Sequence, residues 1–169
     1  MNQFLKIGHL VGLAVFVGSI PTHIVLGHLV DPATDLQGFA TLMQAKYMTI
    51  LVLTAPGLVL ALLTGTALML RRAMTPNRFR WMTVKLVLVG LITLNGALFL
   101  TPLARDISAV ARAAVSAGAL PTEYADLARR EAAFGAANLA MILAVIGLVV
   151  VKPALRPNVT KTHGTGAVL

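Results

Sequence analysis

The stretch IGHLVGLAVFVGSIPTHIVLGHLV, residues 7–30, has the length and apolar character of a membrane span, yet it carries three of the chain's four histidines. A helix needs about 20 apolar residues to cross the roughly 30 Å hydrocarbon core of a bilayer. Ionisable side chains are costly there and usually have a function. The segment therefore predicts a transmembrane helix that brings histidine chemistry into the membrane.

The rest of the chain has the same character. Hydrophobic residues make up 57% of the 169 residues and charged residues only 12%, whereas a soluble domain has about a quarter charged residues. The mean hydropathy is +0.84. Membrane-length apolar runs recur at residues 48–70, 82–103 and 132–151. We predict an all-α membrane protein, an antiparallel bundle of four transmembrane helices at about 5–30, 36–71, 80–103 and 122–152, in one domain covering residues 1–153.

The basic residues indicate the orientation. The second connection holds four arginines and no acid, whereas the first and third connections contain all the acidic residues. By the positive-inside rule the second connection is cytoplasmic, and both termini lie on that side. The pattern predicts a multi-pass protein of a bacterial-type inner membrane, with the lipid bilayer as its partner. The net charge of +8 then reflects membrane orientation and not nucleic-acid binding.

Two connecting segments have their own patterns. The Ala-rich run RDISAVARAAVSAG predicts a short interfacial helix at about 105–117, lying along the outer membrane surface. Residues 154–169 have no apolar periodicity, which predicts a disordered cytoplasmic tail. Within the second span, Pro56 frees the carbonyl of Val52, and such a break is tolerated in a membrane where a packed or ligand-lined interior compensates for it.

Three ionisable residues inside the spans are candidate site residues. His9 and Lys85 both lie near the cytoplasmic start of a helix, so they could face each other, although Lys85 could also snorkel to the headgroups. His23 follows His9 by fourteen residues, which places both on nearly one helix face, about 21 Å apart. His23 is either a ligand or a buried histidine that is hydrogen-bonded to a partner such as Asn138 or Tyr47.

A heme is the cofactor that best uses such a histidine. Its iron binds imidazole, and its flat apolar ring fits between helices. We therefore expect heme b, with His9 and His23 as candidate iron ligands, and with Lys85, Arg71 or Arg72 near the propionates. A proton path through His and Lys is a competing use. A bare metal site is disfavoured because the four apolar runs contain no carboxylates and the chain contains no cysteine.

Four segments add a family resemblance. LKIGHLVGLAVFVG, LTAPGLVLALLTGTALML, RWMTVKLVLVGL and VIGLVVVKP resemble, in order and spacing, the HemJ-type protoporphyrinogen oxidases and the four-helix membrane proteins of the DUF2269 type. The resemblance implies a heme-associated bundle in which His9 and Lys85 are functional. In HemJ proteins the reaction is oxidation of protoporphyrinogen IX to protoporphyrin IX. This chain differs from them at VLGHLVDP and TLNG, and its longer third connection looks more like the DUF2269 proteins.

Two functions are consistent with these observations. The first is a b-type heme protein in electron transfer or porphyrinogen oxidation, with His9 and Lys85 as its catalytic candidates if it is an enzyme. The second is a non-enzymatic accessory or assembly subunit of a larger respiratory or photosynthetic membrane complex, in which the histidines are structural. A homo-oligomer is compatible with either function.

Overall fold

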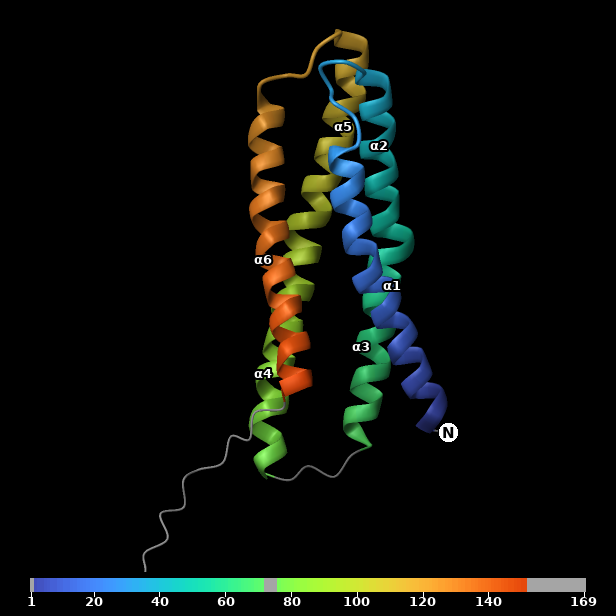
Figure 1. Ribbon diagram of the computed structural model, residues 1–169, viewed down its shortest axis with the longest axis vertical. Helices are drawn as coiled ribbons and strands as arrows, with labels where there is room; N and C mark the ends of the chain where they lie inside the picture. Colours follow the sequence, from blue (N-terminus) through green and yellow to red (C-terminus); the bar gives the residue numbers. More distant parts are fainter. Residues whose placement is uncertain (1, 72–75, 152–169) are drawn as a thin grey trace, which may run out of the picture.

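The computed structural model describes residues 2–71 and 76–151, and all regular structure in that part of the chain is helical. Arg72 and the tail predicted at 154–169 lie outside the described residues. Four helices are long and apolar enough to cross a membrane: Gln3–His28, Leu36–Leu70, Met82–Ala117 and Glu123–Val150. They run side by side in alternating directions (Figure 1), which confirms the predicted four-helix membrane bundle.

Two of the four helices are composite. The first helix is α1 (Asn2–His28) and the last is α6 (Glu123–Val151). Between them, α2 (Leu36–Thr49), the π-helix η1 (Ile50–Thr54) and α3 (Ala55–Leu70) follow one another without a break. The next path consists of α4 (Pro76–Asn95), the π-helix η2 (Gly96–Leu100) and α5 (Thr101–Ala117).

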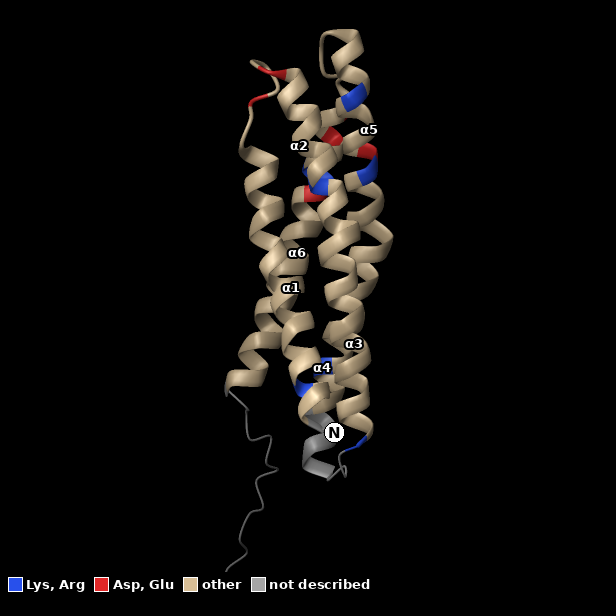
Figure 2. Ribbon diagram, turned by 90° about the vertical axis from the view of Figure 1, so that its right-hand side faces the viewer, with Lys and Arg blue, Asp and Glu red and all other residues tan. Residues whose placement is uncertain are grey.

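The two ends of the bundle differ in charge. The start of α1, the end of α3, the start of α4 and the end of α6 lie at one end (Figure 1), which we call the inner end because the positive-inside rule predicts that it is cytoplasmic. The acidic residues all lie in the opposite half, towards the outer end (Figure 2). The orientation with both termini cytoplasmic stays a prediction that rests on this distribution.

The segment predicted as a separate surface helix at about 105–117 has a different structure, and that prediction is wrong. Met82–Ala117 is one helix of 36 residues, about 54 Å long, which exceeds the roughly 30 Å hydrocarbon core. Its outer part, α5, therefore projects beyond the membrane alongside α2 (Figure 1). Pro102 does not separate the two parts: it directly follows the π-turn η2, in which the Thr101 N–H donates to the Gly96 carbonyl, and the helix continues through it into α5.

Packing against α2 explains why α5 continues the helix of α4 and η2 instead of turning away from it. Its small and apolar residues form one stripe that is buried against α2, and the resulting outer core consists of Phe39, Ala40, Met43, Ile107 and Ala111. The ring of Tyr124 on α6 meets Phe39 edge-on, with ring centroids 5.5 Å apart. Burial of this stripe against α2 removes its apolar surface from water and holds α5 alongside α2.

The inner half is assembled differently, from a close contact between α1 and α3. A Cβ atom added at Gly12 would lie 2.7 Å from the Ala61 nitrogen, and one at Gly57 would lie 2.8 Å from the Phe16 nitrogen. Such distances are shorter than any side chain tolerates, so glycine is required for the two backbones to approach. Gly8 and Gly12 supply the predicted small-residue spacing on α1.

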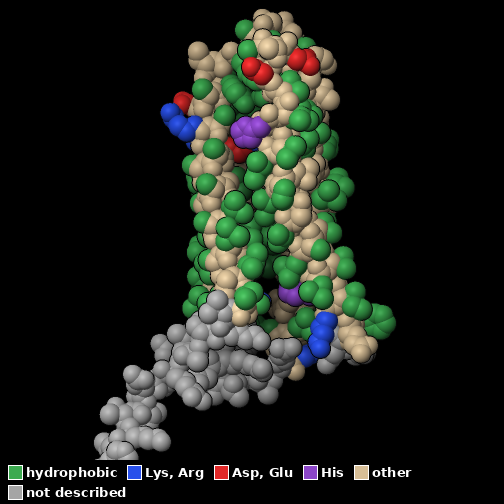
Figure 3. All heavy atoms as spheres, viewed as in Figure 1, with side chains coloured by type: hydrophobic (Ala, Val, Ile, Leu, Met, Phe, Trp, Pro, Cys, Tyr) green, Lys and Arg blue, Asp and Glu red, His purple; other side chains and the backbone are tan. Residues whose placement is uncertain are grey.

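All four helices contribute to a second core, near the middle of the bundle. Phe16, Ile92 and Ile142, from α1, α4 and α6, form a buried apolar cluster that Leu58 of α3 joins. Towards the inner end from this cluster, none of the described side chains of α4 or α6 is buried. The α1/α3 pair and the α4/α6 pair diverge there (Figure 1), and Figure 3 shows a furrow between α1 and α6 on one face.

Candidate functional site

The inner site is centred on His9, whose imidazole lies against α3. Its Nδ1 is 2.8 Å from the carbonyl oxygen of Ala61 and 3.3 Å from the Thr64 hydroxyl oxygen. A carbonyl oxygen can only accept, so Nδ1 carries the hydrogen. The neutral ring then keeps its lone pair on Nε2, the nitrogen that is left to bind a metal ion or accept a proton.

Gly65 fixes the plane in which this ring lies. A Cβ atom at Gly65 would lie 2.9 Å from Cε1 and 3.3 Å from Nδ1 of His9. A side chain at this position would push the imidazole away from the Ala61 carbonyl. The spacing Gly57-x-x-x-Ala61-x-x-x-Gly65 is visible in the sequence and indicates a small-residue face on α3, a signal that we did not use in predicting the site.

The other residues predicted for the inner site come from different helices. Lys85 is half-buried on α4, and Arg71 is exposed at the end of α3. Because α1 pairs with α3 and α4 pairs with α6, His9 and Lys85 belong to the two helix pairs that diverge at the inner end. The facing His9–Lys85 pair therefore stays a prediction. Arg72 lies outside the described residues.

The outer site is a chain of three hydrogen bonds that begins at His23. Its Nε2 is 2.8 Å from the hydroxyl oxygen of Thr54, which donates to Ser19 Oγ at 2.9 Å. The Ser19 hydroxyl in turn donates to the Phe16 carbonyl at 2.7 Å. Since the Thr54 hydrogen is directed at Ser19, Nε2 of His23 is the donor. The partner is thus Thr54, and not Asn138 or Tyr47 as the sequence suggested.

The π-helix explains why Thr54 was not foreseen. In η1 the backbone bonds widen, and the Ala55 N–H donates to the Ile50 carbonyl, five residues earlier, just before Pro56. One additional residue in a turn rotates the side chains that follow it, and π-turns often occur at functional sites. The predicted interruption at Pro56 therefore takes the form of a π-turn in a continuous helix.

One ring nitrogen of His23 has no hydrogen-bond partner, and an ion pair lies close by, towards the outer end. His23 Nδ1 is buried and has no hydrogen-bond partner. One turn farther along α1, a Cβ atom at Gly27 would lie 3.5 Å from the Lys46 ammonium, which forms a 2.7 Å ion pair with Glu131 of α6. The absence of a side chain at Gly27 leaves room for this ammonium group beside α1.

The two histidines contact the same neighbouring helix, as their fourteen-residue spacing indicated. His9 contacts α3 and His23 contacts η1, and the cluster of Phe16, Ile92 and Ile142 lies between the two sites. Within the described residues, no group of three or more His, Cys, Asp or Glu side chains could hold a metal ion. Single-histidine ligation of a cofactor that brings its own metal remains chemically feasible at His9.

One comparison with known proteins gives a match. Residues 3–153 match the model of the family described as "Predicted integral membrane protein (DUF2269)". The matched range includes all four transmembrane helices and both histidine sites. No curated protein and no solved structure matches the chain.

Proposed function

The chain belongs to the DUF2269 family of predicted integral membrane proteins, and on this premise we propose that it binds a b-type heme through His9 and acts in electron transfer. The proposal concerns the inner half of the bundle. There His9 donates a hydrogen bond through its Nδ1, and the α1/α3 pair to which it belongs diverges from the α4/α6 pair.

The observation that carries the proposal is the hydrogen bond from His9 Nδ1 to the Ala61 carbonyl. Metal-binding histidines almost always donate their second ring N–H to a carbonyl or carboxylate, which fixes the tautomer and makes the ligating nitrogen more basic. At His9 the backbone of α3 fills this role, and Gly65 lets the ring approach closely enough. The protein thus presents Nε2 in the form that a heme iron binds.

The surroundings also fit a heme. The inner parts of α4 and α6 bury none of their described side chains, so they have apolar surface available for a flat macrocycle. Lys85 on α4 and Arg71 at the end of α3 are cations at the inner side, where they would attract the propionates. The heme would supply reversible one-electron chemistry at its iron, and these residues would bind and orient it.

An absorption spectrum tests the proposal directly. The purified protein, loaded with hemin in detergent, should show a Soret band, and His9→Ala should lose most of it because the iron loses its ligand. His23→Ala is the matched control, since it changes a histidine on the same face of α1 and should keep the band. A fully folded wild-type protein without a Soret band, or equal heme retention by both variants, would contradict the proposal.

The resemblance to HemJ-type proteins suggests a finer activity, the oxidation of protoporphyrinogen IX. Six electrons and six protons leave the substrate, and a quinone-type acceptor must take up the electrons. Anaerobic protoporphyrinogen with an added quinone should then give porphyrin fluorescence, which Lys85→Ala should abolish. Loaded protein that produces no fluorescence would leave electron transfer as the function and remove the oxidase activity.

One observation favours the second function, that of an accessory subunit. The hydrogen-bond chain from His23 through Thr54 and Ser19 is typical of a structural histidine in a helix bundle. If His9 has the same role, His9→Ala should lower the stability of the bundle while the wild-type protein shows no heme absorbance.

A further inference from the structure

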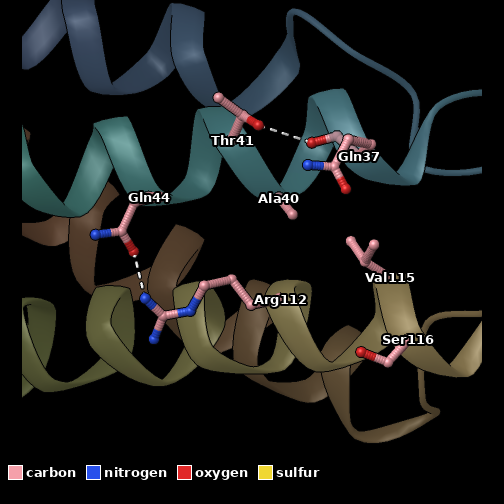
Figure 4. Close-up of a pocket in the computed structure, with 7 residues that line it drawn as sticks. All are labelled: Gln37, Ala40, Thr41, Gln44, Arg112, Val115 and Ser116. Carbon is pink, nitrogen blue, oxygen red and sulfur yellow. Dashed lines mark hydrogen bonds between the residues drawn. The ribbon is translucent and has the colours of Figure 1, made fainter.

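A pocket of about 330 Å³ lies between α2 and α5 in the outer half. Figure 4 shows the pocket between α2 and α5, which line its two sides, and the pocket is largely open to the surroundings of the bundle. The outer core formed by Phe39, Ala40, Met43, Ile107 and Ala111 holds α2 and α5 together. The residues that line it include Gln37, Gln44, Arg112, Val115 and Ser116.

The inner end of the pocket lies at the depth of the outer lipid headgroups. The apolar run 132–151 of α6 is about 30 Å long, which matches the hydrocarbon core. Glu131, just beyond this run, and its ion-pair partner Lys46 therefore lie at the outer edge of the hydrocarbon. Gln44 is two residues farther out on α2, about 3 Å along the helix. The headgroup layer of one leaflet is about 5–8 Å thick, so the pocket begins within it.

The lining favours an anion. Arg112 is the only charged residue of the lining, which contains no acid. Its Nη1 donates to Gln44 Oε1 at 2.8 Å, and the Ser108 hydroxyl donates to the same oxygen at 2.8 Å. That carbonyl oxygen is thus satisfied by two donors and does not repel an anion. A guanidinium has five N–H groups, so Arg112 keeps donors for a ligand, while Gln37 and Ser116 add neutral donors.

An apolar helix face continues inward from the pocket. On α2 and η1, Met48, Leu51 and Val52 follow Gln44 at helical spacing, and their side chains are 46%, 43% and 67% exposed. Residues four and seven or eight positions apart share one face of a helix. A ligand with an anionic head in the pocket and acyl chains on this face would satisfy both surfaces.

We propose that the α2–α5 pocket binds the phosphate of an anionic phospholipid of the outer leaflet, with Arg112 as the charged contact. Arginine suits this role because its planar fork of donors matches phosphate oxygens. The proposal does not depend on heme binding by His9. It predicts a lipid that stays with the protein in detergent and stabilises the outer half of the bundle.

Native mass spectrometry of protein released from nanodiscs tests this proposal. The nanodiscs contain phosphatidylcholine with a minor fraction of phosphatidylglycerol, and the wild-type protein should retain phosphatidylglycerol in preference. Arg112→Gln should weaken this retention by on the order of tenfold, which is the effect of losing one charge-assisted contact. Arg105→Gln is the matched control, because Arg105 has the same charge and lies two turns away on α5 but does not line the pocket.

A second variant separates the pocket from its charge. Val115→Trp fills the pocket and keeps both arginines, so it should also lose the lipid while the variant elutes as a folded protein. Equal losses in Arg112→Gln and Arg105→Gln would overturn the proposal, because they would indicate general surface charge. Inorganic phosphate that stabilises the protein in pure phosphatidylcholine as well as phosphatidylglycerol does would also overturn it, since a free anion would then be the ligand.

Discussion

The two histidine sites on α1 use the same side chain on nearly the same helix face, yet they differ in which ring nitrogen the protein engages. At the inner site, the Nδ1–H of His9 donates to a backbone carbonyl of α3, so Nε2 keeps its lone pair for a ligand. At the outer site, His23 gives its Nε2–H to the Thr54 hydroxyl and leaves a buried Nδ1. The partner supplied by the neighbouring helix therefore decides what each imidazole offers.

The packing around the two sites also differs. At the inner site, α1 and α3 are in close contact through glycines, and the α4/α6 pair diverges from them. The outer site lies where α1 meets α2 and η1, beneath an ion pair that links α2 to α6. We therefore expect substitutions at the glycine contact to disrupt mainly the inner site, and substitutions of polar residues to disrupt the outer site.

The largest effect should come from Gly12→Val. The new side chain would meet backbone atoms of Ala61 and Gly57, which cannot move aside without separating α1 from α3. We expect a loss of about 3 kcal/mol in the free energy of unfolding, the upper end for overpacking, measured by reversible unfolding in bicelles. Gly18→Val is the control, because a Cβ atom there meets nothing within 4 Å. Similar losses for both would show that the contact does not determine the inner half.

A smaller effect is expected from Lys46→Met, which leaves the Glu131 carboxylate without its partner. The side chains of this pair are only 13% and 19% exposed, so the loss should be about 2 kcal/mol. Adding Glu131→Gln should restore part of this stability, and the double-mutant cycle measures the coupling.

The exposed pair of Arg129 and Asp126 is the control for this ion pair. Its side chains are 79% and 62% exposed, so Arg129→Met should cost less than about 0.5 kcal/mol. If Lys46→Met cost equally little, the ion pair would not hold the outer half together.

The smallest effect should come from Thr54→Val, which keeps the shape of the side chain but removes its hydroxyl. His23 Nε2 would lose its acceptor and Ser19 its donor, at a cost of about 1–2 kcal/mol in the free energy of unfolding. Thr49→Val removes a hydroxyl that bonds only the Ala45 carbonyl of its own helix, so it should be nearly neutral. Equal costs would mean that the chain to His23 contributes nothing.

Some features of the sites could be predicted because they depend on local sequence. The fourteen-residue spacing from His9 to His23 fixes their common face, since an α-helix turns by about the same angle at every residue. The Gly8-x-x-x-Gly12 spacing indicated a close helix neighbour. The course of α5 could not be predicted in this way, because its upright position depends on burial against α2, a helix far away in the sequence.

The sequence by itself determined the four membrane-spanning helices, the charge difference between the two ends of the bundle and the position of the histidines on α1, because apolar length, helical period and charge distribution are properties of each segment. Only the tertiary structure decided which nitrogen each histidine keeps. The partners lie 52 residues away for His9 and 31 residues away for His23, and a glycine contact and a π-turn bring them into reach. Hydrogen bonding depends on tenths of an ångström between helices, and that precision comes from packing.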